Sequence, residues 1–231
     1  MRRSDLDLVR ALPLFRDVDA THFDALMSAA FLQRFPKLVV LVEEGNPADF
    51  LHIVIEGAVE LFARSGERET TLEIVRPVTT FILAAVIRDE VYLKSARTLT
   101  AARILMLPAA SVRDVFDRDP HFARAVVAEL AVRYRGLVRT LKDQKLRTGI
   151  ERLANWILQE EREQGGRGRI ILAHDKRTLS SRLGMTPENL SRNLAGLSDH
   201  GVTSRGAEIV IADRQALERW ARPDPLIDGA G

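Results

Sequence analysis

Three polar side chains in the C-terminal third of the chain have the spacing of a helix that reads nucleic acid. Glu188, Ser191 and Arg192 are three and four residues apart, which places them on one face of a helix. Such an arginine can donate two hydrogen bonds to guanine, and such a glutamate can accept one from cytosine. We therefore expect these three side chains to read base edges in a DNA major groove. A structural role is the alternative for Glu188, because the helix dipole favours an acid in the first turn.

The sequence around these residues predicts the two helices of a helix-turn-helix. A short amphipathic helix begins near Leu179, Gly184 allows a left-handed turn, and Thr186 can cap the second helix. Residues 167–192 contain six basic and two acidic side chains, whereas the whole chain has a net charge of only +2. This local excess suits a phosphate backbone, although a solvated charged surface can show it too. We expect phosphate contacts from Arg177, Arg182, Thr186 and Asn189.

The composition of the chain restricts the class of protein to which it can belong. Its 231 residues are 46% hydrophobic, which is enough for the cores of one large or two modest domains. The chain has no cysteine, which excludes disulfides and cysteine-ligated iron–sulfur clusters and fits a reducing compartment. No apolar run approaches the roughly 18–20 residues of a membrane span, and the first residues lack the apolar stretch of a cleavable signal. We expect a cytoplasmic protein without a membrane partner.

Hydrophobic periodicity divides the chain into three blocks. Residues 4–34 have helical spacing, and residues 39–107 are short apolar runs separated by turn residues, which predicts an antiparallel sandwich or barrel. The helical third block ends in a strand, the helix-turn-helix and a hairpin around Gly206, the order of a winged helix-turn-helix. The expected domains are an effector-sensing β-roll at 1–118, a dimerisation helix at 119–148, a winged helix-turn-helix at 149–222 and a frayed tail at 223–231.

The long helical run after Pro120 carries a heptad pattern. Its members are spaced alternately by three and four positions and end at Gln144. Such a seam suits two copies of one helix in a left-handed pair, and DNA readers commonly bind two half-sites as dimers. The alternative is a helix that packs only on its own domain. We expect a homodimer whose seam is formed by Val127, Leu130, Tyr134, Leu137 and Leu141.

The order of these elements resembles the cyclic-AMP receptor protein/fumarate–nitrate regulator (Crp/Fnr) family of bacterial transcription factors. The resemblance covers residues 8–222. Its motifs are Leu14-Phe15, residues 44–49 and 51–57, the long helix, and residues 152–154 and 188–192. It implies an α+β fold with a cyclic-nucleotide-binding-like β-sandwich of jelly-roll type, a long dimerisation helix and a C-terminal winged helix-turn-helix. It also implies a sequence-specific transcription regulator that is controlled allosterically by a small-molecule effector and contacts RNA polymerase.

The first turn of the reading helix resembles one branch of this family. Pro187 precedes Glu188, as a nonpolar residue does in the Glu-x-x-Ser-Arg pattern of the fumarate–nitrate branch. By this resemblance we expect palindromic double-stranded DNA with TTGA-type half-sites. Arg192 would contact guanine, Glu188 the cytosine of the opposite strand, and Ser191 a position near thymine.

The effector region departs from the relatives that bind cyclic AMP. In those relatives a Gly-Glu pair contacts the ribose and an arginine contacts the phosphate. Ile82 and Leu83 stand at the Gly-Glu position here, and Lys94 lacks the bidentate geometry of arginine. We therefore do not expect cyclic AMP to bind. The expected pocket has apolar walls and two polar anchors, and its residues are Leu83, Val86, Tyr92, Leu93, Lys94, Arg97, Tyr134 and Val138.

The sequence leaves the effector open. A small aromatic or apolar acid would place its carboxylate on Lys94 or Arg97, and regulation without a ligand is also consistent. Haem would need an axial histidine and would make the protein a sensor of nitric oxide or carbon monoxide. His52 is the candidate haem ligand, with core packing as its alternative. None of the five histidines has the spacing of a metal site, so no metal site is expected. The sequence does not identify the target genes or whether the regulator activates or represses.

Two rival classes are less consistent with the sequence. An enzyme would need a nucleophilic triad, paired carboxylates or a phosphate-binding loop, and the sequence has none of these patterns. We therefore expect no catalytic residues. A ligand-binding module without DNA would leave the basic stretch and residues 188–192 without a role.

Overall fold

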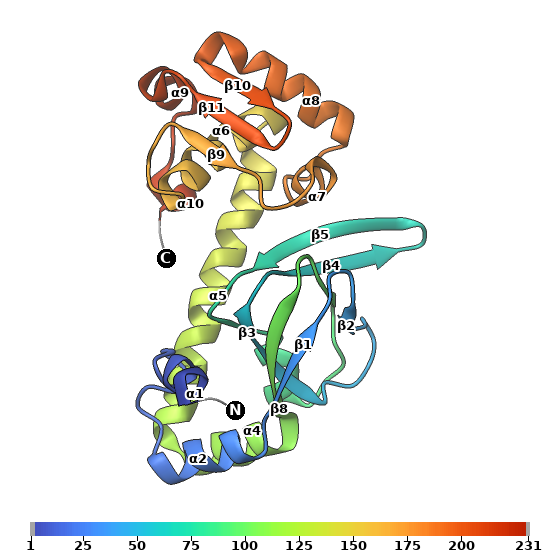
Figure 1. Cartoon of the computed structure of the whole chain (residues 1–231), viewed down its shortest axis with the longest axis vertical. Helices are drawn as coiled ribbons and strands as arrows, with labels where there is room; N and C mark the ends of the chain where they lie inside the picture. The colour runs from blue at the N-terminus through green and yellow to red at the C-terminus, as the bar shows by residue number, and fades with distance from the viewer. Residues whose placement is uncertain (1–2, 230–231) are drawn as a thin grey trace. The chain divides into compact units, whose positions relative to one another are not determined.

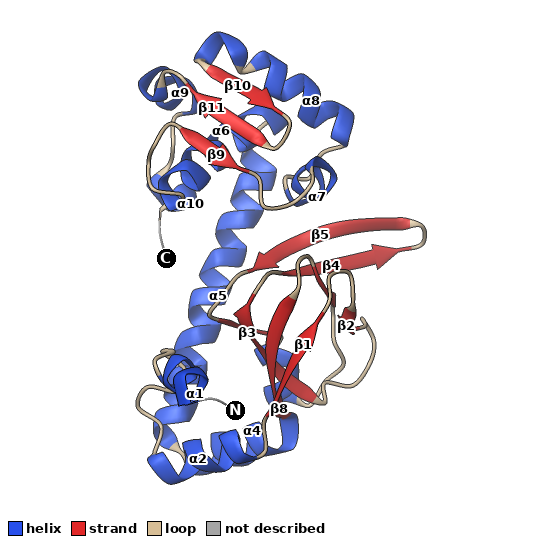
Figure 2. Ribbon diagram, in the orientation of Figure 1, coloured by secondary structure: helices blue, strands red, loops and turns tan. Residues whose placement is uncertain are grey.

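The computed structural model describes residues 3–229, which form two compact units. The first unit is Met1–Arg133 and the second is Tyr134–Gly231, and each has its own hydrophobic core. The first combines a β-sandwich with helices, and the second is a small three-stranded sheet with helices (Figure 1, Figure 2). The predicted α+β class is confirmed, as is the order of sandwich, long helix and helix-turn-helix.

The sandwich of the first unit consists of two antiparallel four-stranded sheets, with the orders β1-β8-β3-β6 and β2-β7-β4-β5. The strands are β1 (Phe31–Phe35), β2 (Val40–Val42), β3 (Phe50–Glu56), β4 (Val59–Ser65), β5 (Arg68–Val75), β6 (Thr79–Phe81), β7 (Ser95–Thr98) and β8 (Ala102–Pro108). At the turn between β3 and β4, Gly57 has φ +85°, and a Cβ there would lie 2.4 Å from the Ala101 carbonyl oxygen. Only glycine fits this turn, because the backbone approaches so closely.

The first unit also contains helices, among them the first part of a long helix. They are α1 (Arg3–Arg10), α2 (Ala20–Ser28), α3 (Leu83–Arg88), α4 (Ala109–Arg118) and the first part of α5 (Pro120–Leu146). The prediction of helix through residue 34 is wrong at its end, where β1 pairs with β8 from Phe31↔Met106 to Phe35↔Ala102. Local periodicity cannot reveal this strand, because its partner lies about 70 residues later in the sequence.

Asp119 joins three helices of the first unit at one buried carboxylate. It accepts hydrogen bonds from the backbone amides of Asp19, His121 and Phe122 at 2.9, 2.9 and 3.1 Å, and it lies 3.0 Å from Nδ1 of His22. Burial alone would raise its pKa, but these hydrogen bonds lower the pKa of Asp119 to about 2. The carboxylate therefore caps the start of α5 and holds the start of α2 against it.

The second unit begins within α5 and contains the expected winged helix-turn-helix. Its elements are α6 (Gly149–Glu163), β9 (Arg169–Ile171), α7 (Lys176–Arg182), α8 (Pro187–Gly196), a short 3-10 helix η1 (Ser198–His200), β10 (Val202–Arg205), β11 (Glu208–Ile211), α9 (Arg214–Ala221) and α10 (Pro225–Asp228). The antiparallel sheet has the order β10-β11-β9. Leu153, Ile157, Leu179 and Leu190 are fully buried in the core that joins α6, α7 and α8.

The end of the described chain is folded, which corrects the expectation of a frayed tail. Residues Pro225–Asp228 form α10, which is capped by the side chain of Asp224. Asp228 accepts two hydrogen bonds from the Arg147 guanidinium at 2.7 and 2.5 Å. Asp143 is a further partner of Arg147 at 3.0 Å. The tail residues 230 and 231 lie outside the described residues. In the described part of the chain, no helix is both long enough and apolar enough to cross a membrane.

The Asp119 carboxylate predicts an acid-dependent stability difference. Its pKa in the folded protein lies below the ordinary aspartate value of 3.8, so its contribution to stability is complete above about pH 4 and is lost as the pH falls towards about 2. We expect Asp119→Asn to lower the free energy of unfolding of the first unit by about 1–2 kcal/mol at pH 7. Urea unfolding followed by circular dichroism should show that this difference from the wild type shrinks below pH 4. Asp117→Asn, an exposed neighbour, is the control. A difference that stays constant down to pH 2.5 would contradict this role.

Candidate nucleic-acid interface and effector cavity

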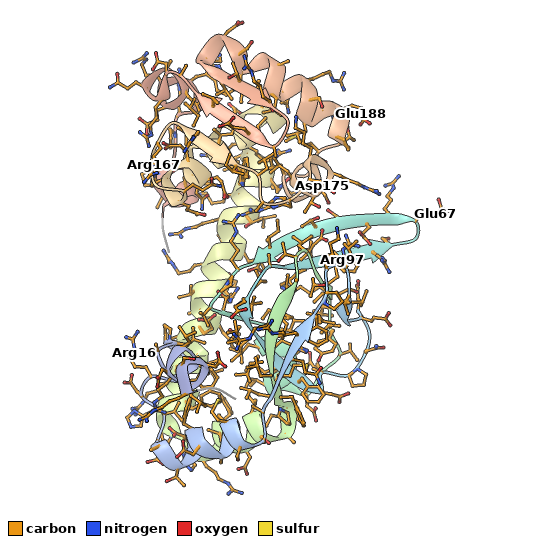
Figure 3. The ribbon with its side chains drawn as sticks, in the orientation of Figure 1. Arg16, Glu67, Arg97, Arg167, Asp175 and Glu188 are labelled. Carbon is orange, nitrogen blue, oxygen red and sulfur yellow. The ribbon has the colours of Figure 1, made fainter. Side chains whose placement is uncertain are left out.

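The helix α8 presents the three predicted base-reading residues to solvent. Glu188, Ser191 and Arg192 are all exposed, whereas Leu190 and Leu194 on the opposite side of α8 are buried in the core. The helix begins at Pro187, whose missing N–H is harmless in the first turn. Thr186 caps the helix, because its hydroxyl accepts a hydrogen bond from the Asn189 amide at 3.2 Å. Figure 3 labels Glu188 on the first turn of α8.

Hydrogen bonds within α8 arrange the polar ends of these side chains. The Arg192 guanidinium donates to Oδ1 of Asn189 at 2.5 Å, and the Ser191 hydroxyl donates to the Pro187 carbonyl at 3.0 Å. A hydrogen bond with its own backbone amide, a second with Thr186 and the charge of Arg192 lower the pKa of Glu188. At neutral pH, Glu188 is therefore an ionised acceptor beside a cationic donor, the pair of groups that a C·G base pair requires.

The four predicted phosphate contacts divide into two groups. Arg177 on α7 is exposed, and Arg182 at the end of α7 is half-buried and has an interaction within the protein. Thr186 and Asn189 are exposed, but the capping bond and the bond from Arg192 already occupy one acceptor on each. Asn189 therefore contacts Arg192, the arginine that is predicted to read a base.

A buried arginine fixes the turn between α7 and α8. The Arg152 guanidinium on α6 donates to the carbonyl oxygens of Leu183 at 2.9 Å and Arg147 at 2.7 Å, and it lies 3.5 Å from that of Gly184. These carbonyls belong to helix ends, which lack intrahelical donors. Gly184 has φ +63°, and a Cβ there would lie 2.6 Å from the side-chain oxygen of Gln144. The orientation of α8 therefore depends on contacts from α5 and α6.

A small cavity in the first unit is lined by two of the residues that were expected in the effector pocket, Leu83 and Lys94. It has a volume of about 150 Å³, and its polar residues include Lys94 and Glu73 from the sandwich and Arg133 from α5. Arg133 donates to Oε1 of Glu73 at 2.9 Å and to the carbonyl of Thr80 at 2.8 Å. Nζ of Lys94 lies 3.7 Å from Oε2 of Glu73. The apolar residues at the cavity are Leu61, Phe81, Ile82, Leu83, Ala84 and Leu130.

Of the predicted pocket residues, Leu83 and Lys94 line this cavity and the others do not. Val86 is fully buried in the core, Tyr92 lines a different cavity, and Leu93 is 81% exposed. Tyr134 and Val138 belong to the second unit and are exposed. Arg133 was not predicted as a cavity residue, although its spacing of three from Leu130 on α5 was an available signal.

The structure does not place Arg97, one of the two expected ligand anchors, at the small cavity. Its guanidinium donates to Oε2 of Glu60 and Oε1 of Glu69, both at 2.7 Å, and lies 4.4 Å from the centre of the Phe62 ring. Glu60 is itself buried, so Arg97 neutralises a buried carboxylate. Figure 3 labels Arg97 in the sandwich unit. The side chain is therefore part of an ion cluster and not of the 150 Å³ cavity.

Ile82, which lines this cavity, has an unusual backbone conformation. It has φ +65° at the N-cap of α3, a left-handed conformation that costs a β-branched residue roughly 1–2 kcal/mol. Glycine adopts this conformation without such a cost. The backbone conformation at this position thus suits a glycine, while the isoleucine side chain fills space at the cavity.

The residues of this region do not fit the two large ligands that the family suggests. A volume of about 150 Å³ is below the roughly 300 Å³ at which pockets for drug-sized ligands begin, so neither cyclic AMP nor haem fits the cavity as it stands. No histidine is among the residues that line it. His52 lies at the other cavity, where the lining contains Glu43 and Asp49 but no lysine or arginine to hold haem propionates.

The predicted dimer seam on α5 is largely uncovered in the single chain. The exposed fractions are 62% for Val127, 69% for both Tyr134 and Leu137, and 57% for Leu141. Leu130 differs, because it packs partly on the core of the first unit and lines the small cavity. Leu130 is therefore both a predicted seam residue and a residue of the small cavity.

These features define a DNA-binding transcription regulator whose sensory domain is of the cyclic-nucleotide-binding type. Residues 32–119 match the family described as "Cyclic nucleotide-binding domain", and residues 151–220 match "Crp-like helix-turn-helix domain". The chain belongs to the Crp/Fnr family of transcription regulators, which confirms the resemblance.

Three similar proteins each match most of the length of this chain. The "CRP-like cAMP-activated global transcriptional regulator" of Mycobacterium tuberculosis is 26% identical over 215 residues, which are 90% of this chain and 96% of that protein. The structure of a regulatory protein from Silicibacter pomeroyi DSS-3 is 27% identical with a TM-score of 0.63 and covers 96% of this chain and 100% of its own. FixK2 of Bradyrhizobium japonicum is 22% identical with a TM-score of 0.72 over 82% of this chain and 96% of its own, which supports the fold alone.

The Arg152 contacts predict a loss of stability in the second unit. We expect Arg152→Met, which keeps the length of the side chain but not its donors, to lower the free energy of unfolding by about 2–4 kcal/mol, because buried carbonyls lose their partner. Thermal unfolding followed by the fluorescence of Trp156 and Trp220, both in this unit, measures the change. Arg162→Met on the exposed face of α6 is the matched control. Equal stability of the two variants would contradict the role of Arg152.

Proposed function

We propose that this protein is a homodimeric regulator that reads palindromic DNA with TTGA-type half-sites. The observation that supports this most is the exposed set of Glu188, Ser191 and Arg192 on a capped helix whose other side is buried. The exposed apolar stripe on α5 supports the homodimer, because a surface of this kind favours pairing with a second copy. A DNA-binding regulator acts where the chromosome is, so the proposal places the protein in the cytoplasm, with RNA polymerase as a partner and without catalytic activity of its own.

The effector that the small cavity suits best is a small carboxylic acid. Two cations, Lys94 and Arg133, lie at the cavity, where Glu73 pairs with both of them and Glu129 pairs with Arg133. Phe81, Leu83 and Leu130 offer apolar surface. Arg133 and Leu130 belong to α5, so a ligand that competes with Glu73 for Arg133 would act directly on the helix that carries the dimer seam. In the proposed mechanism, this contact changes how the two copies of α5 pack and so alters the spacing of the two copies of α8.

The base-reading role of Arg192 predicts a change in specificity. We expect Arg192→Ala to weaken binding to a palindromic TTGA duplex by about 1–3 kcal/mol per half-site and to abolish discrimination at one base pair. Fluorescence anisotropy with duplexes that carry single base-pair changes, at fixed salt, measures both effects. Arg219→Ala on the exposed side of α9 is the control. An equal loss of affinity for all duplexes would show that Arg192 contacts only phosphate.

The cavity predicts the charge of the effector. We expect small carboxylates to raise the melting temperature of the protein and to change its affinity for DNA, and Lys94→Met to weaken both responses at least tenfold. Leu93→Ala should leave them unchanged, because Leu93 is exposed next to Lys94 without lining the cavity. Cyclic AMP should give no heat in calorimetric titration. Micromolar binding of cyclic AMP, or responses that are intact in Lys94→Met, would contradict this assignment.

A further inference from the structure

The helix α10 is bound to the end of α5 by a pair of side chains that are 81 residues apart in the sequence. The guanidinium of Arg147 donates from Nη1 to Oδ1 of Asp228 at 2.7 Å and from Nη2 to Oδ2 at 2.5 Å. Both side chains are largely buried, with 9% of Arg147 and 18% of Asp228 exposed. A bidentate pair of this kind fixes the orientation of both groups. The contact therefore holds α10 in one position against α5.

The segment that carries Asp228 is ordered at both ends. The Asp228 carboxylate also accepts a hydrogen bond from the Asp224 amide at 2.7 Å, and the Asp224 side chain caps α10. Where the segment leaves α9, the carbonyl of Ala221 accepts a hydrogen bond from Asn155 of α6 at 3.1 Å. The helix α10 lies beyond residues 151–220, which match the helix-turn-helix family. Its contact with α5 is therefore an addition to the matched domain.

Arg147 connects this contact to the helix-turn-helix. Its carbonyl accepts a hydrogen bond from Arg152 at 2.7 Å, and Arg152 also donates to the carbonyl of Leu183, at the end of α7, at 2.9 Å. In the same turn of α5, the Gln144 side chain packs on the turn before α8, since a Cβ on Gly184 would lie 2.6 Å from its oxygen. A shift of Arg147 would therefore tilt α8 relative to the end of α5.

Arg147 has a second carboxylate partner within its own helix. Asp143, one turn earlier in α5, accepts a hydrogen bond from Nη1 of Arg147 at 3.0 Å. The hydrogen bond with Asp228 most of all, and then that with Asp143, raise the pKa of Arg147, so the group remains charged. Because Asp143 still pairs with the guanidinium when Asp228 is changed, α5 keeps a paired arginine. Only the link between α10 and α5 is then lost.

We propose that Asp228 is a positioning residue for DNA recognition, because it fixes the angle between α5 and α8 through Arg147. This inference rests on the proposed function, in which two copies of α5 pair and two copies of α8 read one palindrome. A fixed angle lets both copies of α8 reach their half-sites at one spacing, whereas a loose angle permits several spacings. In this role Asp228 sets the accepted spacing between half-sites, and not the base pairs within each half-site.

Duplexes with altered spacing test this role. Fluorescence anisotropy at fixed salt compares a palindrome of TTGA-type half-sites with versions that have two base pairs added or removed between the half-sites. We expect the wild type to bind the altered duplexes at least tenfold more weakly, because both half-sites cannot be contacted at once. Asp228→Asn should reduce this penalty to about threefold or less. Its affinity for a duplex with a single half-site should equal that of the wild type.

Two further variants and a second measurement separate this role from a general loss of charge or folding. Glu218→Gln removes the same charge from an ion pair within α9, with Arg214 at 2.7 Å, and should behave as the wild type does. Asp228→Glu keeps the carboxylate and should restore the spacing preference. Hydrogen exchange in residues 143–152, measured by mass spectrometry, should be faster in Asp228→Asn than in the wild type and in Glu218→Gln.

The outcomes distinguish this inference from the function on which it rests. A spacing penalty in Asp228→Asn as large as in the wild type, an equal change in Glu218→Gln, or unchanged exchange in residues 143–152 would overturn the inference alone. A wild type that binds the palindrome no better than a single half-site would overturn the proposed function instead. The exchange rates would then decide by themselves whether Asp228 holds the end of α5.

Discussion

The contacts of one buried guanidinium group connect three helices of the second unit, α5, α6 and α7. Arg152 on α6 donates to the carbonyl oxygens of Arg147, at the end of α5, and of Leu183, at the end of α7. A buried charge must be fully compensated by hydrogen bonds, which forces these helix ends to converge on one group. Arg147 itself is held by Asp143 and Asp228, so the last helix of the described chain supports the same junction. The orientation of α8 follows from this arrangement, and with it the direction of the face that carries Glu188, Ser191 and Arg192.

The sandwich unit places an isoleucine in a backbone conformation that suits glycine. Ile82 has a left-handed conformation, and its side chain occupies space at the smaller cavity. Lys94, Arg133 and Glu73 form a compact ionic group there, of which Arg133 belongs to the long helix. The stacked rings of His52 and Phe81, 5.1 Å apart, separate this cavity from the larger one of about 460 Å³, because each ring lines one of the two. The two cavities therefore lie on either side of one aromatic contact.

Local signals in the sequence account for the features that were predicted correctly. The cap residue Thr186, the turn residue Gly184 and the apolar spacing of α8 lie within a few residues of one another, so the helix-turn-helix could be derived from the sequence. The strand β1 and the helix α10 could not, because each depends on a partner far away in the chain, β8 for β1 and Arg147 for α10. Arg97 and Lys94 were expected together in one pocket, but residues three apart in an extended chain point to opposite faces.

Selection of bound duplexes from a random DNA library by the full-length protein tests the central claim most directly. The account predicts enrichment of two inverted TTGA-type half-sites whose centres are about one helical turn apart. That result would support both the base-reading face of α8 and the pairing of two copies. Binding without any enriched sequence, or enrichment of a single asymmetric site, would contradict the account.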